Sequence, residues 1–462
     1  MNGRRALPDG PLVGFYGDDF TGSSAAMEAL AFAGLDTVLF LAPPTPERLA
    51  AFAGARGVGV AGVARSRDPA WMGEHLPPVF RLLRSLGAPV VHYKVCSTFD
   101  SAPHIGSIGR AMDLAAGLFE GWMPLVVADP AMGRFQCFGN LFALAGGRGH
   151  RLDRHPTMSR HPVTPMDEAD LGRHLARQTA RPIGLVDFVA MKRGQGVARL
   201  EQELANGARI VSLDVLDEET LIEAGRLVWE RGVRDEGGGP RVFAVGSQGL
   251  EAALVAYWRA AGLLPAAPVR RPPGRVGRIA CVSGSVSPVT AGQIAYATGH
   301  GFAGIRMEAE RAVDERAWEA EIGRATGEAL RALSEGRDPL VYSAAGPADP
   351  AVVALRRAVA DAGAPPEAVN DRIGAGLGRV LDAVVREAGL ARVVISGGDT
   401  SGHAAAALGV DALTAIAPLA PGSPLCRAHA ADPARDGLQV ALKGGQVGEE
   451  DFFCAVRDGT PA

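Results

Sequence analysis

Short apolar runs alternate with segments of helical periodicity along almost the whole chain, and this alternation limits the possible folds more than any other feature of the sequence. In the first half the apolar runs lie at 11–16, 37–41, 57–63, 89–95, 124–128, 183–186, 209–213 and 241–245. In the second half they lie at 278–283, 302–306, 339–343, 391–396, 412–417 and 437–443. Strands that alternate with helices form mainly parallel sheets with helices on both faces. The sequence therefore predicts an α/β fold.

The length of the chain and one interruption in the pattern predict two domains. A chain of 462 residues is too long for one ordinary hydrophobic core. The segment 263–277 is rich in proline and arginine and cannot continue a helix, which indicates a linker. We predict an N-terminal domain at 1–262 and a C-terminal domain at 278–462, each with a mainly parallel sheet flanked by helices. The active site is expected in the cleft between them.

The composition excludes several classes of function. Apolar residues make up 47% of the chain and charged residues 21%, and the net charge is −4, which favours neither nucleic acid nor a membrane surface as partner. No run is long enough for a transmembrane helix, and the N-terminus lacks the apolar segment of a signal peptide. The five cysteines are scattered without metal-ligand spacing. We expect a cytoplasmic protein with reduced thiols and no metal-binding cluster of its own.

Two adjacent carboxylates follow the first predicted strand. Asp18 and Asp19 stand between that strand and the helical run that begins after Thr21, Gly22 and two serines. Ligands of open α/β sheets bind at the carboxyl ends of strands. Two acids there can hold Mg²⁺, accept the proton of a substrate hydroxyl or bind a polyol. The simpler alternative is that Asp19 or Thr21 caps the helix, but a cap needs only one such residue.

Polar side chains also follow the strands at 57–63 and 89–95. Arg65 is a natural clamp for a carboxylate. Lys94 is followed by hydroxyls and an acid, and the candidate substrate-binding residues are Arg65, Lys94, Ser97, Thr98 and Asp100. An ammonium group among hydroxyls suits a small, anionic, hydroxylated ligand. The alternative is a solvated loop with a few charges.

Turns rich in glycine and serine end three strands of the second half. Hydroxyls and free backbone N–H groups at a helix start bind phosphate, and glycines let the backbone approach it closely. Lys443 could also touch a phosphate, although a lone lysine at a strand end is usually a surface charge. The candidate nucleotide-binding residues are Ser283, Ser285, Gly397, Gly398, Asp399, Thr400 and Gly445.

Four motifs resemble those of one family and occur in the same order. They are Asp18-Asp19-Phe20-Thr21-Gly22, Lys94-Val95-Cys96-Ser97-Thr98, Ser396-Gly397-Gly398-Asp399-Thr400-Ser401-Gly402 and Leu442-Lys443-Gly444-Gly445-Gln446-Val447-Gly448. They resemble the Asp-Asp-Leu-Thr-Gly, Lys-x-Asp-Ser-Thr, Gly-Gly-Glu-Thr-Ser and Lys-Ser-Gly-Asn-Phe-Gly motifs of the four-carbon acid sugar kinases. The resemblance implies phosphorylation of a sugar-acid hydroxyl by ATP and Mg²⁺. It places the acid sugar on the N-terminal domain and the nucleotide on the C-terminal domain.

The chain departs from these motifs in the acceptor half. Cys96 replaces the family's acid, and Asp100 stands where an arginine is usual. The acceptor can therefore be a four-carbon acid such as threonate or erythronate, or a branched keto-acid such as 3-oxo-isoapionate, which some relatives phosphorylate. Asp18 and Asp19 are the candidate catalytic residues.

Two other functions stay open at this stage. One is an NAD-dependent sugar-acid dehydrogenase, against which the lack of a GxGxxG motif after a strand argues. The other is a non-catalytic sugar-acid-binding protein, which would not need three turns suited to phosphate. The expected partners are a small sugar acid and ATP, with a homodimer as a further expectation.

Overall fold

The computed structural model describes residues 6–161, 163–232 and 242–460, without the side chains of Asp399 and Thr400. The chain divides into two compact units. The N-terminal unit holds the described residues up to Thr37 and Pro43–Pro268, and the C-terminal unit holds Val38–Ala42 and the described residues from Val269 onward. Residues 263–279, which include the predicted linker, form neither helix nor strand.

The N-terminal unit is built on a parallel sheet in the order β3-β1-β4-β11-β5-β10-β9. Its strands are β1 (Val13–Gly17), β3 (Gly57–Ala61), β4 (Val90–Lys94), β5 (Met123–Val126), β9 (Ile183–Val186), β10 (Ile210–Leu213) and β11 (Val242–Gly246). Each lies at a predicted strand, so the parallel α/β prediction is confirmed for this unit. The order brings β11 between β4 and β5, which the sequence pattern does not reveal.

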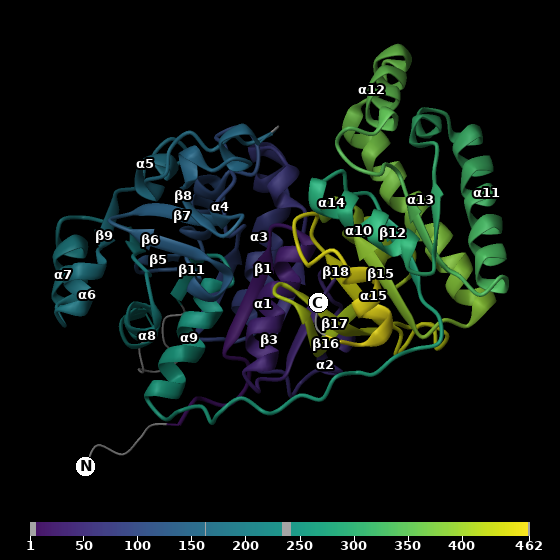
Figure 1. Cartoon of the computed structure of the whole chain (residues 1–462). Coiled ribbons are helices and arrows are strands. Elements are labelled where there is room, and N and C mark those ends of the chain that lie inside the picture. The colour runs from purple at the N-terminus through teal and green to yellow at the C-terminus, as the bar shows by residue number, and fades with distance from the viewer. Residues whose placement is uncertain (1–5, 162, 233–241, 461–462) are drawn as a thin grey trace. The chain divides into compact units, whose positions relative to one another are not determined.

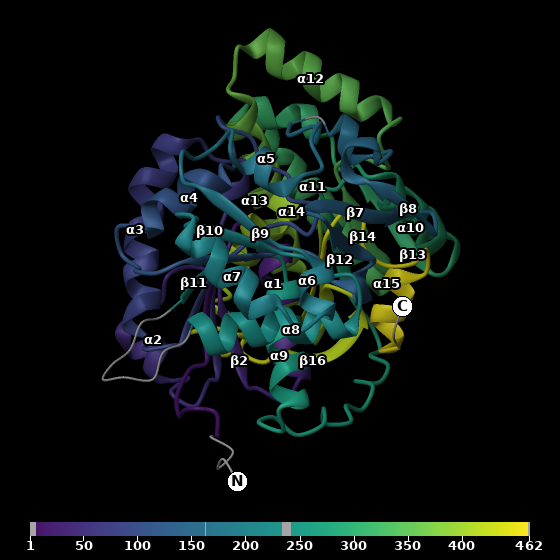
Figure 2. The same cartoon turned by 90° about the vertical axis from the view of Figure 1, so that its left-hand side faces the viewer.

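Helices connect these strands. They are α1 (Phe20–Phe32), α2 (Pro46–Ala50), α3 (Pro69–Ser85), α4 (Ile108–Ala115), α5 (Leu171–Leu175), α6 (Phe188–Lys192), α7 (Gly196–Ala205), α8 (Glu218–Leu227) and α9 (Gly249–Ala260). Helices α3 and α4 pack against each other (Figure 2), and α8 packs on α9. No described helix of the chain is long and apolar enough to cross a membrane.

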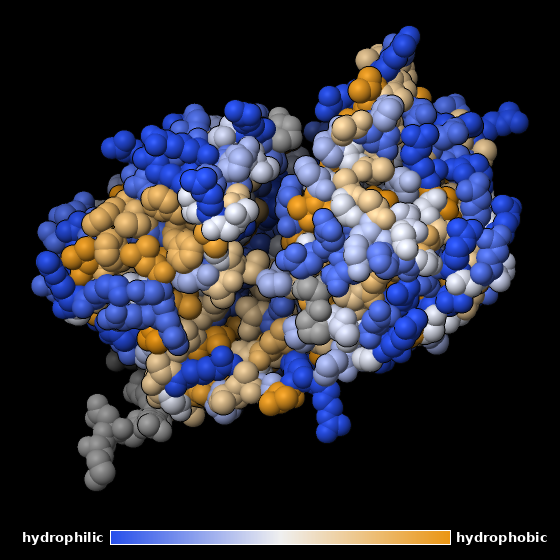
Figure 3. Space-filling view, in the orientation of Figure 1, coloured by the Kyte–Doolittle hydropathy of each residue, from blue (hydrophilic) through white to orange (hydrophobic). Residues whose placement is uncertain are grey.

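A small antiparallel sheet in the same unit is absent from the sequence prediction. It consists of β6 (Arg134–Cys137), β7 (Asn140–Ala145) and β8 (Arg148–Arg151), joined by tight turns. Strands β6 and β8 are four residues long and carry charged or glycine residues, so only β7 has an apolar run like those of the main sheet. Hydrophobic surface gathers over this part of the unit (Figure 3), and Phe138 and Leu144 are among its exposed apolar side chains.

The sheet of the C-terminal unit is mixed and has the order β13-β14-β12-β15-β18-β17-β16-β2. Strands β12 (Ala280–Ser283), β13 (Phe302–Arg306), β14 (Asp338–Tyr342), β15 (Arg392–Ser396) and β18 (Gln439–Lys443) are parallel. Strands β2 (Thr37–Phe40), β16 (Ala412–Ala420) and β17 (Ser423–His429) are antiparallel. The hairpin partner β17 was not predicted, and β2 pairs with β16 although its sequence lies in the predicted N-terminal domain.

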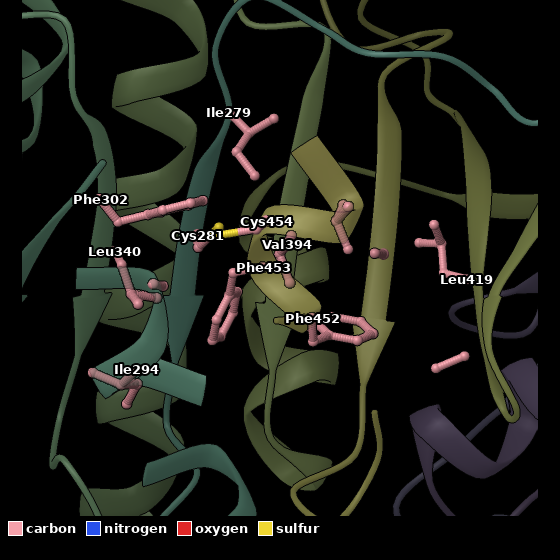
Figure 4. Close-up of a cluster of buried hydrophobic side chains, with 14 of the residues drawn as sticks. Ile279, Cys281, Ile294, Phe302, Leu340, Val394, Leu419, Phe452, Phe453 and Cys454 are labelled. Atoms are coloured by element: carbon pink, nitrogen blue, oxygen red, sulfur yellow. The ribbon is translucent and has the colours of Figure 1, made fainter. Parts of the chain in front are cut away.

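Helices flank this sheet and a buried cluster anchors it. The helices are α10 (Pro288–Gly299), α11 (Glu315–Ser334), α12 (Pro350–Ala362), α13 (Pro366–Ala388), α14 (Gly398–Ala407) and α15 (Phe452–Asp458). Helices α11 and α13 pack against each other (Figure 1). Phe452 and Phe453 of α15 are fully buried with Cys281 of β12 (Figure 4). Cys281 and Cys454 are both free thiols.

Candidate functional site

The two adjacent aspartates lie buried where β1 meets α1. Asp18 is 2% exposed and Asp19 is 6% exposed. Asp19 caps α1, because its carboxylate accepts hydrogen bonds of 2.8 Å from the Gly22 N–H and of 2.8 Å from the Thr21 hydroxyl. The helix-cap alternative therefore describes Asp19 in part. Asp18 takes no part in this cap, and a buried carboxylate of this kind needs a cation.

Arg65, from the turn after β3, supplies that cation to both aspartates. Its Nη2 donates to Asp18 Oδ1 at 2.6 Å and to Asp19 Oδ1 at 2.9 Å. Its Nε donates to Asp18 Oδ2 at 3.2 Å, and its Nη1 lies 2.9 Å from Asp19 Oδ2. The guanidinium that the sequence suggests as a clamp for a substrate carboxylate is therefore mostly engaged by the protein's own acids.

Lys94 comes to the same place from the end of β4. It is 2% exposed, and its carbonyl accepts a hydrogen bond of 2.9 Å from the Asp18 N–H. A Cβ on Gly22 would lie 2.1 Å from Lys94 Nζ and 2.2 Å from Asp19 Oδ1. Only glycine at position 22 therefore lets the start of α1 approach the ammonium and carboxylate groups so closely.

The two aspartates differ in their pKa values and in the number of further hydrogen bonds that their carboxylates can accept. Burial raises the pKa of Asp18 to about 6, with Arg65 acting in the opposite direction. Burial would also raise the pKa of Asp19, but Arg65 and Lys94 outweigh it and hold that pKa below its usual value. Each oxygen of Asp19 already accepts two hydrogen bonds or ion-pair contacts, whereas each oxygen of Asp18 accepts one from Arg65. Asp18 can accept a further proton donor.

The turn after β4 forms a short polar chain. The Thr98 hydroxyl donates to Asp100 Oδ1 at 2.6 Å and lies 3.0 Å from Cys96 Sγ. Burial raises the pKa of the Cys96 thiol to about 11, so it is neutral at ordinary pH. Burial would raise the pKa of Asp100 too, but Arg65 holds it below its usual value. Ser97 is half-buried beside these groups.

Three further polar residues at the same sheet edge were missed by the sequence analysis. Asp129 follows β5 and Gln248 follows β11, and the Gln248 side chain donates to Asp129 Oδ2 at 3.2 Å. Arg134 begins β6, and its N–H donates to the Asp129 carbonyl at 3.0 Å. Asp129 and Gln248 follow the predicted strands 124–128 and 241–245, just as Asp18 follows the first predicted strand. The same pattern in the sequence could therefore have identified them.

In the C-terminal unit the predicted turns converge, because β12, β15 and β18 are neighbours in the sheet. The Gly284 N–H donates to the Ser396 carbonyl at 3.0 Å, and the Gly397 N–H to the Lys443 carbonyl at 2.8 Å. A Cβ on Gly445 would lie 2.7 Å from Ser285 Oγ. Gly397 has a φ of +126° and precedes α14, which begins at Gly398. Ser283 is fully buried at the end of β12.

Lys443 lies within this convergence and is fully buried, not a surface charge. Its Nζ donates to Thr290 Oγ1 at 3.1 Å and to the Gly444 carbonyl at 2.9 Å. No carboxylate among the described side chains pairs with it, and burial lowers its pKa to about 7. The buried Ser396 hydroxyl also lacks a hydrogen-bond partner in the described structure. An unpaired cation and an open hydroxyl beside a helix start fit phosphate oxygens.

The remaining candidates are Asp399 and Thr400, a metal site, and the glycine-rich segment 374–378. The side chains of Asp399 and Thr400 lie outside the described residues. Among the described side chains, no group of three or more His, Cys, Asp or Glu could hold a metal ion. The glycine-rich segment Gly374–Gly378 lies inside α13, where Gly376 packs against Trp318 and Gly378 against Ala404. Its glycines therefore serve helix packing, not dinucleotide binding.

A buried acid pair on one α/β unit and converging Gly and Ser turns on the other are the features expected of a two-domain kinase of small molecules. Residues 13–254 match the model of a sugar-binding N-terminal domain, and residues 280–453 match that of a nucleotide-binding C-terminal domain. The chain belongs to the four-carbon acid sugar kinase family, and it is an ATP-dependent kinase of acid sugars.

Similar proteins cover nearly the full length of the chain. A 3-oxo-isoapionate kinase of Paraburkholderia graminis is 51% identical over 98% of this chain and 96% of its own length. A 3-oxo-tetronate kinase of Methylobacterium radiotolerans is 32% identical over 96% of this chain and 97% of its own. A solved Salmonella typhimurium structure superposes with a TM-score of 0.74 at 25% identity, covering 96% of this chain and 98% of that one.

Proposed function

We propose that this kinase phosphorylates a hydroxyl of 3-oxo-isoapionate, a branched keto-acid sugar. The relative of that name is 51% identical over almost the entire chain, against 32% for a 3-oxo-tetronate kinase. The two departures from the family motifs, Cys96 and Asp100, both lie in the acceptor pocket, where a change of acceptor would be accommodated. The observation that carries the chemistry is the buried Asp18 carboxylate, which Arg65 holds with oxygen lone pairs still open.

Asp18 is the proton acceptor in this proposal. Catalysis of phosphoryl transfer is mainly positioning and charge stabilisation, with the hydroxyl proton passing to a carboxylate. A base works best when its pKa lies near the operating pH, and the pKa of Asp18 is about 6. Asp19 stays ionised, caps α1 and fixes Arg65. Lys94, Ser97, Thr98 and Asp100 bind hydroxyl and keto oxygens of the sugar.

The Gly and Ser turns after β12, β15 and β18 bind the nucleotide in this proposal. Ser283, Ser285, Gly397, Gly398 and Gly445 surround the phosphates of ATP, and Asp399 and Thr400 complete the set predicted from the sequence. The buried ammonium of Lys443 neutralises phosphate charge. Mg²⁺, when bound with ATP, would offset the negative charge that develops during transfer.

Transfer requires the γ-phosphate to reach the sugar hydroxyl, so we propose that the acceptor and nucleotide sites meet in the cleft between the domains, with 263–277 as the hinge. Closure of such a cleft excludes water and limits ATP hydrolysis. We place the enzyme in the cytoplasm, where free cysteines and ATP coexist. The exposed Phe138 and Leu144 support a homodimer through the small β6–β8 sheet.

A substrate panel tests the proposal. Purified protein with Mg-ATP is offered 3-oxo-isoapionate, 3-oxo-tetronate, threonate and erythronate, and ADP release is recorded. We expect the highest kcat/KM for 3-oxo-isoapionate. Equal or greater efficiency with a four-carbon acid would contradict the substrate assignment, and no turnover of any acid would contradict the proposed function itself. Replacing ATP by NAD in the same panel tests the dehydrogenase alternative, for which we expect no reaction.

A further inference from the structure

Several buried carboxylates lie close together at the Asp18 end of the acceptor pocket. Three buried carboxylates, Asp18, Asp19 and Asp100, surround the guanidinium of Arg65. Most of the N–H groups of Arg65 already point at Asp18 and Asp19. A substrate carboxylate placed here would face like charges, whereas a hydroxyl would find acceptors. Lys94 also faces Asp18 and Asp19 and offsets their charge. The charged end of a sugar acid therefore needs a cation outside this group.

Arg134 provides a cation at the neighbouring strand ends. Its backbone is fixed to the end of β5 by the hydrogen bond to the Asp129 carbonyl, after a turn in which Gly133 has a φ of +66°. Its Nη1 donates to the carbonyls of Met132 at 3.0 Å and Gly133 at 3.4 Å. Its Nε is buried without a hydrogen-bond partner in the described structure. The Asp129 carboxyl interacts with the guanidinium electrostatically, but no described carboxylate lies within salt-bridge distance of it.

Cys96 connects this guanidinium to the first part of the pocket. Cys96 is partly buried and lies near enough to both Arg65 and Arg134 for a negative charge at this position to interact with either guanidinium. An acid at this position, as in the family motif, would be drawn to both guanidinium groups and would neutralise part of their charge. Because the Cys96 thiol stays neutral, the charge of Arg134 remains available to a ligand.

We propose that Arg134 binds the carboxylate of the sugar acid and so sets which hydroxyl faces Asp18. The carboxylate then lies over the ends of β5 and β11, where Gln248 flanks it, and the reacting hydroxyl lies over the end of β1. This inference rests on the proposed function, since it names the anchor of the same substrate. Arg134 is a specificity-determining residue in this arrangement, not a catalytic one.

The test compares Arg134→Gln, Arg134→Lys and the control Arg148→Gln, which changes an exposed arginine of the same small sheet. Loss of a charged hydrogen-bond donor should raise KM for 3-oxo-isoapionate roughly 10- to 100-fold. The KM for ATP should change by less than about threefold, because the nucleotide site is not touched, whereas kcat should fall because the hydroxyl is no longer held at Asp18. Arg134→Lys should recover part of the loss, and Arg148→Gln should match the wild type. An unchanged sugar-acid KM in Arg134→Gln would overturn the inference.

A binding measurement separates this inference from the proposed function. The thermal shift that threonate, erythronate and 3-oxo-isoapionate give is compared with that of erythritol, which lacks the carboxylate. If the wild type turns over no 3-oxo-isoapionate, the proposed substrate fails, but a sugar-acid shift that disappears in Arg134→Gln and persists in Arg148→Gln still supports the anchor. Equal shifts in the wild type and Arg134→Gln overturn the anchor. A wild type that no sugar acid stabilises contradicts both.

Discussion

The charge of Lys443 should make nucleotide binding depend on pH. Burial without a carboxylate partner among the described side chains lowers the pKa of this ammonium to about 7 in the nucleotide-free protein. Phosphate oxygens bound beside it would favour the charged form and raise that pKa. Binding is then strongest below pH 7 and weakens as the pH rises above 7, because the lysine must first take up a proton.

The size of the effect follows from the linkage. With a free-state pKa of about 7, only about one-tenth of the lysine is charged at pH 8, so binding should take up about 0.9 proton there and about 0.1 at pH 6. If only the charged form binds, the rise in Kd for ATP approaches tenfold per pH unit well above pH 7, and Kd rises about 50-fold between pH 7 and pH 9. Calorimetry in buffers of different ionisation enthalpy measures both quantities.

Two variants test whether Lys443 is the group that titrates. Lys443→Met should bind ATP weakly at every pH, with a flat profile between pH 7 and pH 9. Lys443→Arg keeps its charge throughout this range, so its profile should also be flat. A wild-type Kd that does not change between pH 7 and pH 9 would refute the argument. A Lys443→Met protein with the wild-type slope would show that another group titrates.

Three more predictions follow from the N-terminal unit. The kcat/KM for the sugar acid should fall as pH drops through about 6, since protonated Asp18 cannot accept the hydroxyl proton, and a kcat/KM profile that is flat from pH 5 to 8 would contradict this. His92→Leu should lower the free energy of urea unfolding by about 3 kcal/mol, because Glu251, 2.6 Å away and fully buried, loses its partner; a loss below about 1 kcal/mol would argue against a charged pair. Cys96→Asp should raise KM for the keto-acid by about tenfold in steady-state assays, because the new carboxylate competes for the arginines, and an unchanged KM would count against this.

The strand-end motifs could be predicted because each is local in the sequence. Apolar runs are followed directly by Asp18, Arg65 and Lys94. Because β3, β1 and β4 are adjacent in the sheet, these three side chains come together in the structure. The C-terminal turns converge for the same reason, since β12, β15 and β18 are also adjacent. Their roles in binding and catalysis stay predictions.

The rest of the site depends on topology that local patterns do not encode. Strand β11 follows β5 by more than a hundred residues yet lies beside β4, which brings Gln248 to Asp129. Arg134 opens a strand of four residues, which is too short to stand out in the sequence. The burial of Lys443 could not be inferred from a single charge at a strand end, because it depends on the neighbours that tertiary packing supplies.

Single-turnover phosphorylation of 3-oxo-isoapionate by Asp18→Asn tests whether Asp18 receives the proton of the sugar-acid hydroxyl. The matched control is Asp36→Asn, an exposed acid of the same unit. We expect a rate for Asp18→Asn about 10²–10⁴-fold below that of the control, with ATP affinity unchanged. Equal rates for the two variants would contradict it.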